Sequence, residues 1–186
     1  TQLTPFVYQG NDRKELVEEI AHLKHRIDFA RLDAQGREND IKRGFGGIRE
    51  IEFLVAALQM LGGDADPALR VRGTLPALQV LIDRGLILPG DGDRLRRGYN
   101  LYRRIEHTLQ MMHEGQTHLM PADPDERAKL ALRCGFAKPE KFERTLREMR
   151  DFVRERFSDL FGNVGGREPS LADLICDPLG EPTAAA

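Results

Sequence analysis

The chain has 186 residues, of which 31% are charged and 40% hydrophobic, and its 28 basic and 30 acidic side chains give a formal net charge of −2. This composition predicts a folded domain with its own core and excludes a disordered chain. A general nucleic-acid binder and a protein held on an anionic membrane are both disfavoured, because there is no net positive charge. The longest apolar run, 53–58, is far shorter than the roughly 20 residues of a membrane-spanning helix. Cys134 and Cys176 form no zinc or disulfide pattern, which favours a reducing, cytoplasmic compartment.

Apolar residues recur every three or four positions in six stretches, which predicts six helices. The first begins near Asp12 as its cap and has its apolar face at positions 16–30. The second follows a cluster of glycines and covers 48–61. The third has Thr74 as its predicted cap and a proline in its first turn, and it ends at Gly85.

The last three helices have acidic or proline-containing start signals. The fourth opens at Asp91 or Asp93, and the fifth opens at Asp123, where a proline and two acidic residues follow the cap. The sixth begins at Lys138-Pro139 and ends at Gly162. No stretch alternates strictly between apolar and polar residues, so no strand is predicted.

The predicted fold class is therefore all-α, a helical bundle of about six helices. The bundle domain is expected to cover 1–162, and the glycine- and proline-rich segment 163–186 is expected to be a flexible C-terminal tail or a linker. The first and last residues, TQLTPF and EPTAAA, suggest a piece of a longer protein.

Metal-dependent catalysis would need a cluster of carboxylates or histidines, and three Asp-x-Asp strings occur at 64–66, 91–93 and 123–125. Each lies at a turn or a helix start, where aspartate is common as a cap, so capping is favoured over metal binding. His113 and His118 match no helical zinc motif. No catalytic residue and no metal ligand is predicted in this chain.

A glycine-rich segment before the second helix is the exception. Glycines allow a tight loop whose backbone N–H groups approach a phosphate, and the following helix adds its positive N-terminal end. The predicted phosphate-facing or nucleotide-facing loop consists of three glycines and three cations, Lys42, Arg43, Gly44, Gly46, Gly47 and Arg49. Charged residues expected to support it are Glu52, Arg103, Arg104 and Glu106.

A structural alternative for the same loop stays open. The glycines then only let the second helix pack closely on a neighbour, and Arg49 pairs with Glu52 or Glu106. A divided outcome is favoured, in which Lys42 faces a ligand and Arg49 is structural, because Arg49 lies in the first turn of a helix that must pack.

Three segments carry a resemblance to a known family. IKRGFGGIREIEFLVAALQMLGG at 41–63, ALRVRGTLPALQVLIDRGLI at 68–87 and YNLYRRIEHTLQMMHEGQTHLMP at 99–121 occur in that order. Together they resemble the helical domain that follows a nucleotidyltransferase domain in the glutamine synthetase adenylyltransferase family. The resemblance covers 4–160. Within the family, the sequence is more similar to the helical domain of the N-terminal, deadenylylating half.

The resemblance implies a role in a larger enzyme. The family's catalytic Gly-Ser and paired aspartates belong to the preceding domain, so this chain is expected to be inactive alone. No cofactor is expected in this chain, whereas magnesium and ATP or AMP belong to the full enzyme. The domain is expected to complete the nucleotide cleft and to position glutamine synthetase, with the adjacent nucleotidyltransferase domain and the PII signalling protein as further partners.

Two alternatives remain beside this interpretation. In one, the domain is a non-catalytic interaction module that docks PII or a neighbouring domain through Arg96, Arg97, Arg103 and Arg104. In the other, it is the helical domain of a PII uridylyltransferase-like enzyme, a family that resembles this sequence but usually has a histidine where Glu52 stands. Neither alternative involves nucleic acid or a membrane.

Overall fold

The structure is a computed structural model that describes residues 7–8, 15, 18–19, 39–113 and 117–161. The prediction of an all-α fold is confirmed, since the elements are helices and β-pairing in the described residues is one isolated antiparallel bridge, Asp40 to Leu119. The helices are α4 (Ile48–Gly62), the 3₁₀ helix η1 (Pro67–Leu69), α5 (Thr74–Asp83), α6 (Pro89–His113), α7 (Pro124–Arg133) and α8 (Pro139–Phe161). No helix in these ranges is long and apolar enough to cross a membrane.

Five of the six predicted helices correspond to α4 through α8. The predicted first helix, near Asp12, lies largely outside the described residues, and the predicted tail at 163–186 lies outside them altogether. The boundary between bundle and tail therefore stays a prediction.

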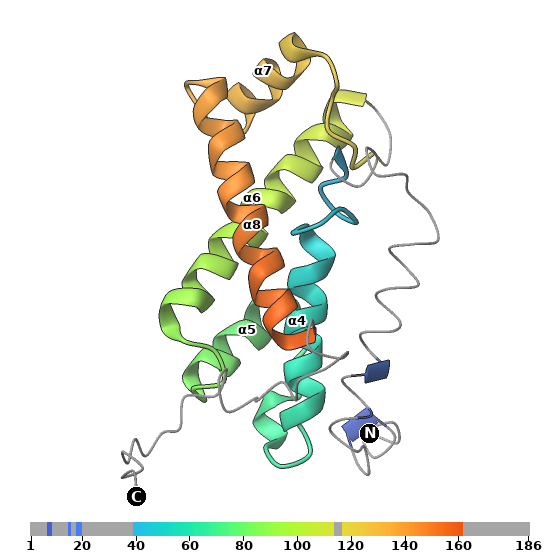
Figure 1. The fold of residues 1–186 in the computed structure, drawn as a ribbon, viewed down its shortest axis with the longest axis vertical. Coiled ribbons are helices and arrows are strands. Elements are labelled where there is room, and N and C mark those ends of the chain that lie inside the picture. Colours follow the sequence, from blue (N-terminus) through green and yellow to red (C-terminus); the bar gives the residue numbers. More distant parts are fainter. Residues whose placement is uncertain (1–6, 9–14, 16–17, 20–38, 114–116, 162–186) are drawn as a thin grey trace, which may run out of the picture.

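α8 runs along the long axis of the molecule and packs against α4, α6 and α7 (Figure 1). α4 lies against α8 and also contacts α5 and α6, while α7 packs across the other end of α8 and α6. A loop at 39–47 leads into α4 at the middle of the bundle (Figure 1). This loop therefore lies where helices from distant parts of the chain meet.

The apolar stripes form one core, as their spacing predicts. In α8 the stripe repeats every three or four positions and is buried at Phe142, Leu146, Met149, Val153, Phe157 and Leu160. In α4 the buried apolar residues are Ile48, Ile51, Leu54, Val55, Ala57 and Leu58. Burial of such side chains contributes roughly 1.5–3 kcal/mol each, so the stripes account for most of the stabilisation of the bundle.

The helix starts are confirmed in part. The Asp123 carboxylate caps α7 by accepting hydrogen bonds from the backbone N–H groups of Asp125 and Glu126, both at 2.9 Å. The prediction of Thr74 as a cap is wrong: the N-cap of α5 is Gly73, at φ 87°, a conformation that favours glycine. The start predicted at Asp91 or Asp93 is also late, because α6 already begins at Pro89, whose fixed φ suits a first helical position.

Candidate functional site

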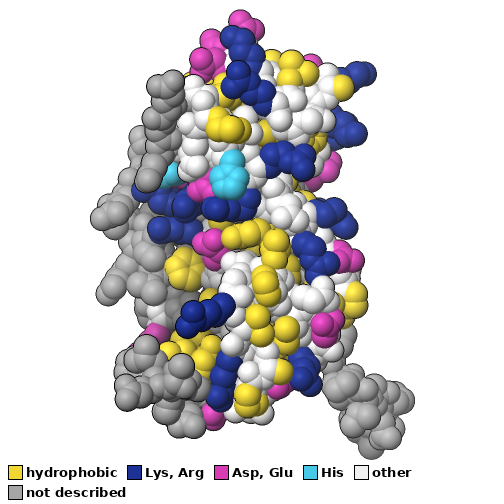
Figure 2. Space-filling model, turned by 180° about the vertical axis from the view of Figure 1, so that it is seen from behind, with side chains coloured by type: hydrophobic (Ala, Val, Ile, Leu, Met, Phe, Trp, Pro, Cys, Tyr) yellow, Lys and Arg dark blue, Asp and Glu magenta, His cyan; other side chains and the backbone are white. Residues whose placement is uncertain are grey.

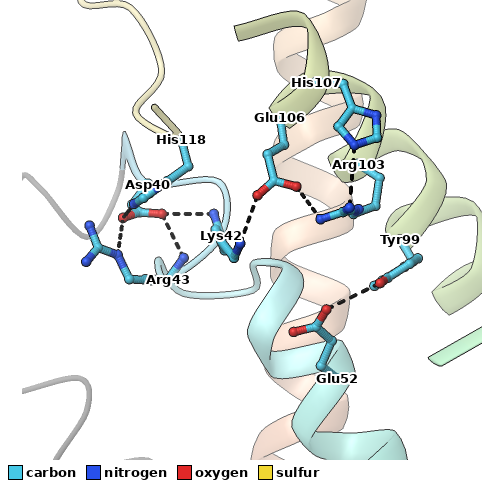
Figure 3. Close-up of polar contacts among 9 residues, drawn as sticks. All are labelled: Asp40, Lys42, Arg43, Glu52, Tyr99, Arg103, Glu106, His107 and His118. Carbon is cyan, nitrogen blue, oxygen red and sulfur yellow. Dashed lines mark hydrogen bonds and ion pairs between the residues drawn. The ribbon is translucent and has the colours of Figure 1, made fainter. Parts of the chain in front are cut away.

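The loop at 39–47 is fastened to the segment that follows α6. The Ile41 N–H donates to the His118 carbonyl oxygen at 2.9 Å, and the Met120 N–H donates to the Asn39 carbonyl oxygen at 2.8 Å. These two hydrogen bonds form the isolated bridge and bring His118 over the loop (Figure 3). Two segments nearly 80 residues apart in sequence thus build one side of the candidate site.

Asp40 organises the loop from within. Its side chain is fully buried, and its Oδ1 accepts the backbone N–H groups of Lys42 at 2.9 Å and Arg43 at 2.7 Å. Its Oδ2 lies 2.9 Å from Arg43 Nε and 3.3 Å from His118 Nε2 (Figure 3). A buried carboxylate with this many donors fixes the turn and orients Arg43.

The surroundings of His118 favour its neutral form. Burial lowers the pKa of His118 below its ordinary value; Asp40 opposes this change, and Arg43 and Lys42 add to it. The 3.3 Å contact between His118 Nε2 and the Asp40 carboxylate is therefore a polar contact of an imidazole whose neutral form is favoured, and not a full ion pair.

The backbone N–H groups at the start of α4 are used within the protein. Those of Ile48 and Arg49 both donate at 3.1 Å, to the carbonyl oxygens of Ile41 and Lys42 respectively. The N–H of Gly44 donates to Asp40 O and that of Gly47 donates to Gly44 O, both at 3.0 Å. A phosphate approaching this loop would therefore meet side chains rather than free backbone donors.

Two of the glycines are required for close packing. Gly46 has φ 65°, and a Cβ placed on it would lie 2.2 Å from the backbone oxygen of Arg150 in α8. A Cβ on Gly47 would lie 2.7 Å from the Ile41 oxygen. The Gly46 N–H donates at 2.9 Å to the buried carboxylate of Glu50. These contacts support the structural alternative for the glycines themselves.

A second buried carboxylate, Glu106 of α6, joins the loop to that helix. Glu106 is 2% exposed, and its Oε1 lies 3.1 Å from Lys42 Nζ while its Oε2 accepts from Arg103 (Figure 3). Arg103 also lies 3.4 Å from His107 Nε2. About a third of the Lys42 and Arg103 side chains is exposed, so both cations reach the surface above a buried anion.

The other predicted site residues are placed apart from this cluster. Arg49 forms no ion pair with Glu52 or Glu106 within the described part of the chain, so the alternative in which it pairs with them is wrong. The reason is that Lys42 and Arg103 take both oxygens of Glu106. Glu52 instead accepts from the Tyr99 hydroxyl at 3.3 Å, and Arg104 donates to the Cys134 carbonyl oxygen at 3.3 Å.

The arginines proposed as one docking face turn to different neighbours. Arg96 bonds Asp93, at 3.1 Å, and Gln79 of α5. Arg103 bonds Glu106, and Arg104 reaches the end of α7. These three arginines therefore contact three different parts of the bundle and do not form one continuous face.

The described residues offer no site for a metal ion. They contain no group of three or more His, Cys, Asp or Glu side chains that could hold one. The Asp-x-Asp strings have structural contacts instead: Asp66 accepts the Ala68 N–H at 2.9 Å and pairs with Arg84 at 3.1 Å, and Asp91 lies 3.6 Å from Arg156.

Asp40 and His118 were absent from the site residues predicted from the sequence. Asp40 stands two residues before Lys42, in the spacing of an aspartate that caps a turn, and this signal points to it locally. His118 gives no such signal, because its contact with Asp40 depends on the tertiary structure.

The family model described as GlnD PII-uridylyltransferase matches residues 14–161. A bifunctional glutamine synthetase adenylyltransferase/adenylyl-removing enzyme from Bordetella pertussis is 43% identical over 167 residues, covering 87% of this chain and 18% of the relative. Proteins with the same name from Stenotrophomonas maltophilia and Xanthomonas campestris pv. campestris are each 40% identical, over 89% and 85% of this chain. The chain spans less than a fifth of the length of these relatives.

Proposed function

The chain belongs to the GlnD PII-uridylyltransferase family of domains, and from that premise we propose that it is the helical domain of an enzyme that adenylylates and deadenylylates glutamine synthetase. The names of its relatives support this proposal, as does the order of the three resembling segments. Its similarity to the deadenylylating half makes removal of AMP the reaction that we expect it to serve. We expect the complete enzyme to be cytoplasmic.

In this proposal the chain supplies no catalytic group. The catalytic carboxylates, with magnesium and ATP or AMP, belong to an adjacent nucleotidyltransferase domain of the same polypeptide. The side chains described here do not fit a magnesium site, since they form no cluster of the required ligands. The isolated chain is therefore expected to show no transfer or removal of AMP.

The role proposed for this domain rests on one observation, the cations Lys42, Arg43 and Arg103 held over the buried carboxylates Asp40 and Glu106. Ion pairing and hydrogen bonds restrict these side chains, so they are oriented before a ligand arrives. Figure 2 shows Lys and Arg side chains gathered beside a histidine on one face of the molecule. We propose that this face closes the nucleotide cleft and contacts phosphate through side chains.

Lys42→Ala in the complete enzyme tests this role. We expect kcat/KM for AMP removal to fall by about tenfold or more, because a charge-assisted contact to phosphate contributes about 1.5–3 kcal/mol. The free energy of unfolding should change by about 1 kcal/mol or less, since Lys42 is partly exposed and Arg103 still pairs with Glu106. Lys42→Arg should recover part of the rate.

Lys129→Ala is the matched control, because Lys129 is an exposed lysine on α7 that belongs neither to the loop nor to the cluster of Lys42, Arg43 and Arg103. We expect it to leave both rate and stability unchanged. If Lys42→Ala instead lowers stability strongly and leaves the kinetics unaltered, the cluster is structural and the proposed role is rejected. Arg49→Ala should have little effect on stability, since Arg49 has no ion pair with Glu52 or Glu106.

The description of the matching family model favours a second candidate, the helical domain of a PII uridylyltransferase-like enzyme. Offering the complete enzyme labelled ATP or UTP, with glutamine synthetase or PII as acceptor, separates the two reactions. Labelling of PII from UTP alone would select the second candidate. Saturable binding of PII to the 186-residue chain would support the interaction module.

A further inference from the structure

A groove of about 400 Å³ lies on the other side of the loop, between the loop, α7 and α8. It is lined mainly by charged side chains. Its cationic and loop residues are Asn39, Phe45, Arg127, Arg147, Arg150 and Arg154. Two carboxylates, Glu143 and Asp151, and Leu146 complete the lining.

The basic lining comes from one face of α8. Arg147, Arg150 and Arg154 are three and four positions apart, so their side chains project from the same side of the helix. This is the side that receives the loop, because Gly46 packs on the Arg150 backbone.

Among the lining residues that the structure describes, positive charges outnumber negative ones. Arg127 and Glu143 neutralise each other through two hydrogen bonds, at 2.9 and 2.8 Å, and Arg127 also donates to the Pro121 carbonyl oxygen at 3.2 Å. The other charged residues in the described lining are Arg147, Arg150, Arg154 and Asp151, an excess of two positive charges. Neither Arg147 nor Arg154 forms an ion pair with any residue that the structure describes.

Two of these guanidinium groups are positioned by the loop. The Arg154 guanidinium carbon lies 4.5 Å from the centre of the Phe45 ring, and Arg150 Nη2 donates to the Asp40 carbonyl oxygen at 3.4 Å. Burial lowers the pKa of Arg150 and Arg127 adds to this change, while Tyr102 and the carboxylates of Asp40 and Glu143 act against it. An anion in the groove would act in the same direction as those carboxylates.

We propose that this groove binds a phosphate group, either free inorganic phosphate or the phosphoryl group of a nucleotide. A planar guanidinium group can donate two parallel hydrogen bonds to two oxygens of one phosphate. The charge of a phosphate dianion also matches the excess of two positive charges. The groove volume falls within the range of small-molecule sites. The site is separate from the Lys42 cluster, so it stands or falls independently of the proposed function.

Calorimetric titration of the 186-residue chain at constant ionic strength tests the proposal with three probes: inorganic phosphate, AMP and adenosine. We expect saturable binding of phosphate and AMP and none of adenosine. Similar affinities for the first two would identify free phosphate as sufficient, and tighter binding of AMP would identify a nucleotide phosphoryl group. Absence of saturable binding by both phosphate and AMP would overturn the proposal.

Variants locate the binding. The double variant Arg147→Ala/Arg154→Ala should weaken phosphate binding by about a hundredfold, about tenfold for each lost charged contact. Both side chains are exposed, so thermal denaturation should show an intact fold. The control is Arg144→Ala, a 70% exposed arginine of the same helix that does not line the groove; it should bind as the wild type does. Binding that survives the double variant, or that is lost in Lys42→Ala instead, would refute this location.

Discussion

The two sides of the 39–47 loop differ in how far their basic side chains are paired with carboxylates. On the α6 side, Lys42, Arg43 and Arg103 share two carboxylates that are 2% exposed or less. On the α8 side, once Arg127 has paired with Glu143, three arginines face one carboxylate. Cations that are already paired are suited to orienting a ligand held mainly by another domain. Cations in excess are suited to binding an anion unaided.

Gly46→Ala tests how tightly the loop packs on α8. Of the substitutions considered, it should have the largest effect on stability. The new Cβ would lie 2.2 Å from the Arg150 oxygen in a backbone at φ 65°. We expect the free energy of unfolding to fall by about 3–5 kcal/mol, the sum of overpacking and left-handed strain. Urea denaturation measures it.

Gly85→Ala is the matched control for that substitution. Gly85 has φ 70° but open space around its Cβ position, so it should lose only the strain, about 1–2 kcal/mol. Equal losses at the two glycines would show that the loop is not tightly packed on α8.

Asp40→Ala tests the paired side and ranks second. It removes an acceptor from two partly buried N–H groups and the partner of Arg43, so we expect a loss of about 3 kcal/mol. Asp123→Ala provides the comparison, because Asp123 also accepts two backbone N–H groups but is exposed. It should lose about 1 kcal/mol in thermal or urea unfolding. A larger loss at Asp123 would contradict the organising role of Asp40.

His118→Gln also tests the α6 side of the loop, through a smaller effect on how the free energy of unfolding depends on pH. Burial lowers the pKa of His118, so at pH values below about 6.5 the unfolded chain binds more protons at this residue than the folded chain does. The stability associated with neutral His118 is therefore lost as pH falls from that value through the lowered pKa. Between about pH 7.5 and 5.5 the wild type should lose more unfolding free energy than the variant. An equal loss in both proteins would show that His118 does not titrate in this way.

Features of the fold that depend on residues close together in the sequence could be predicted from it. The cap at Asp123 and the buried stripe of α8 are local patterns, and both are confirmed. Thr74 failed as a cap because Gly73, whose positive φ the sequence does not reveal, occupies the capping position. Such errors shift a boundary by one or two residues and leave the bundle unchanged.

The site was less predictable, because its contacts join distant residues. Lys42, in the loop, and Arg49, in the first turn of α4, are alike in charge. Only the position of α6 decides that Lys42 reaches Glu106. The arginines of α8 follow an ordinary charged-face pattern on a helix. Their excess over carboxylates becomes visible only when α7 and the loop enclose the same groove.

The packing of Gly46 on Arg150 also bears on the order in which the chain folds during synthesis. The Arg150 guanidinium reaches Asp40 across 110 residues of sequence, and the loop that holds Asp40 precedes every helix from α4 onward. During synthesis on a ribosome, α4, α5 and α6 therefore emerge before α8, the helix on which the loop packs. We expect the loop to reach its final geometry late, after α8 is released, and long-range closure of this kind slows folding.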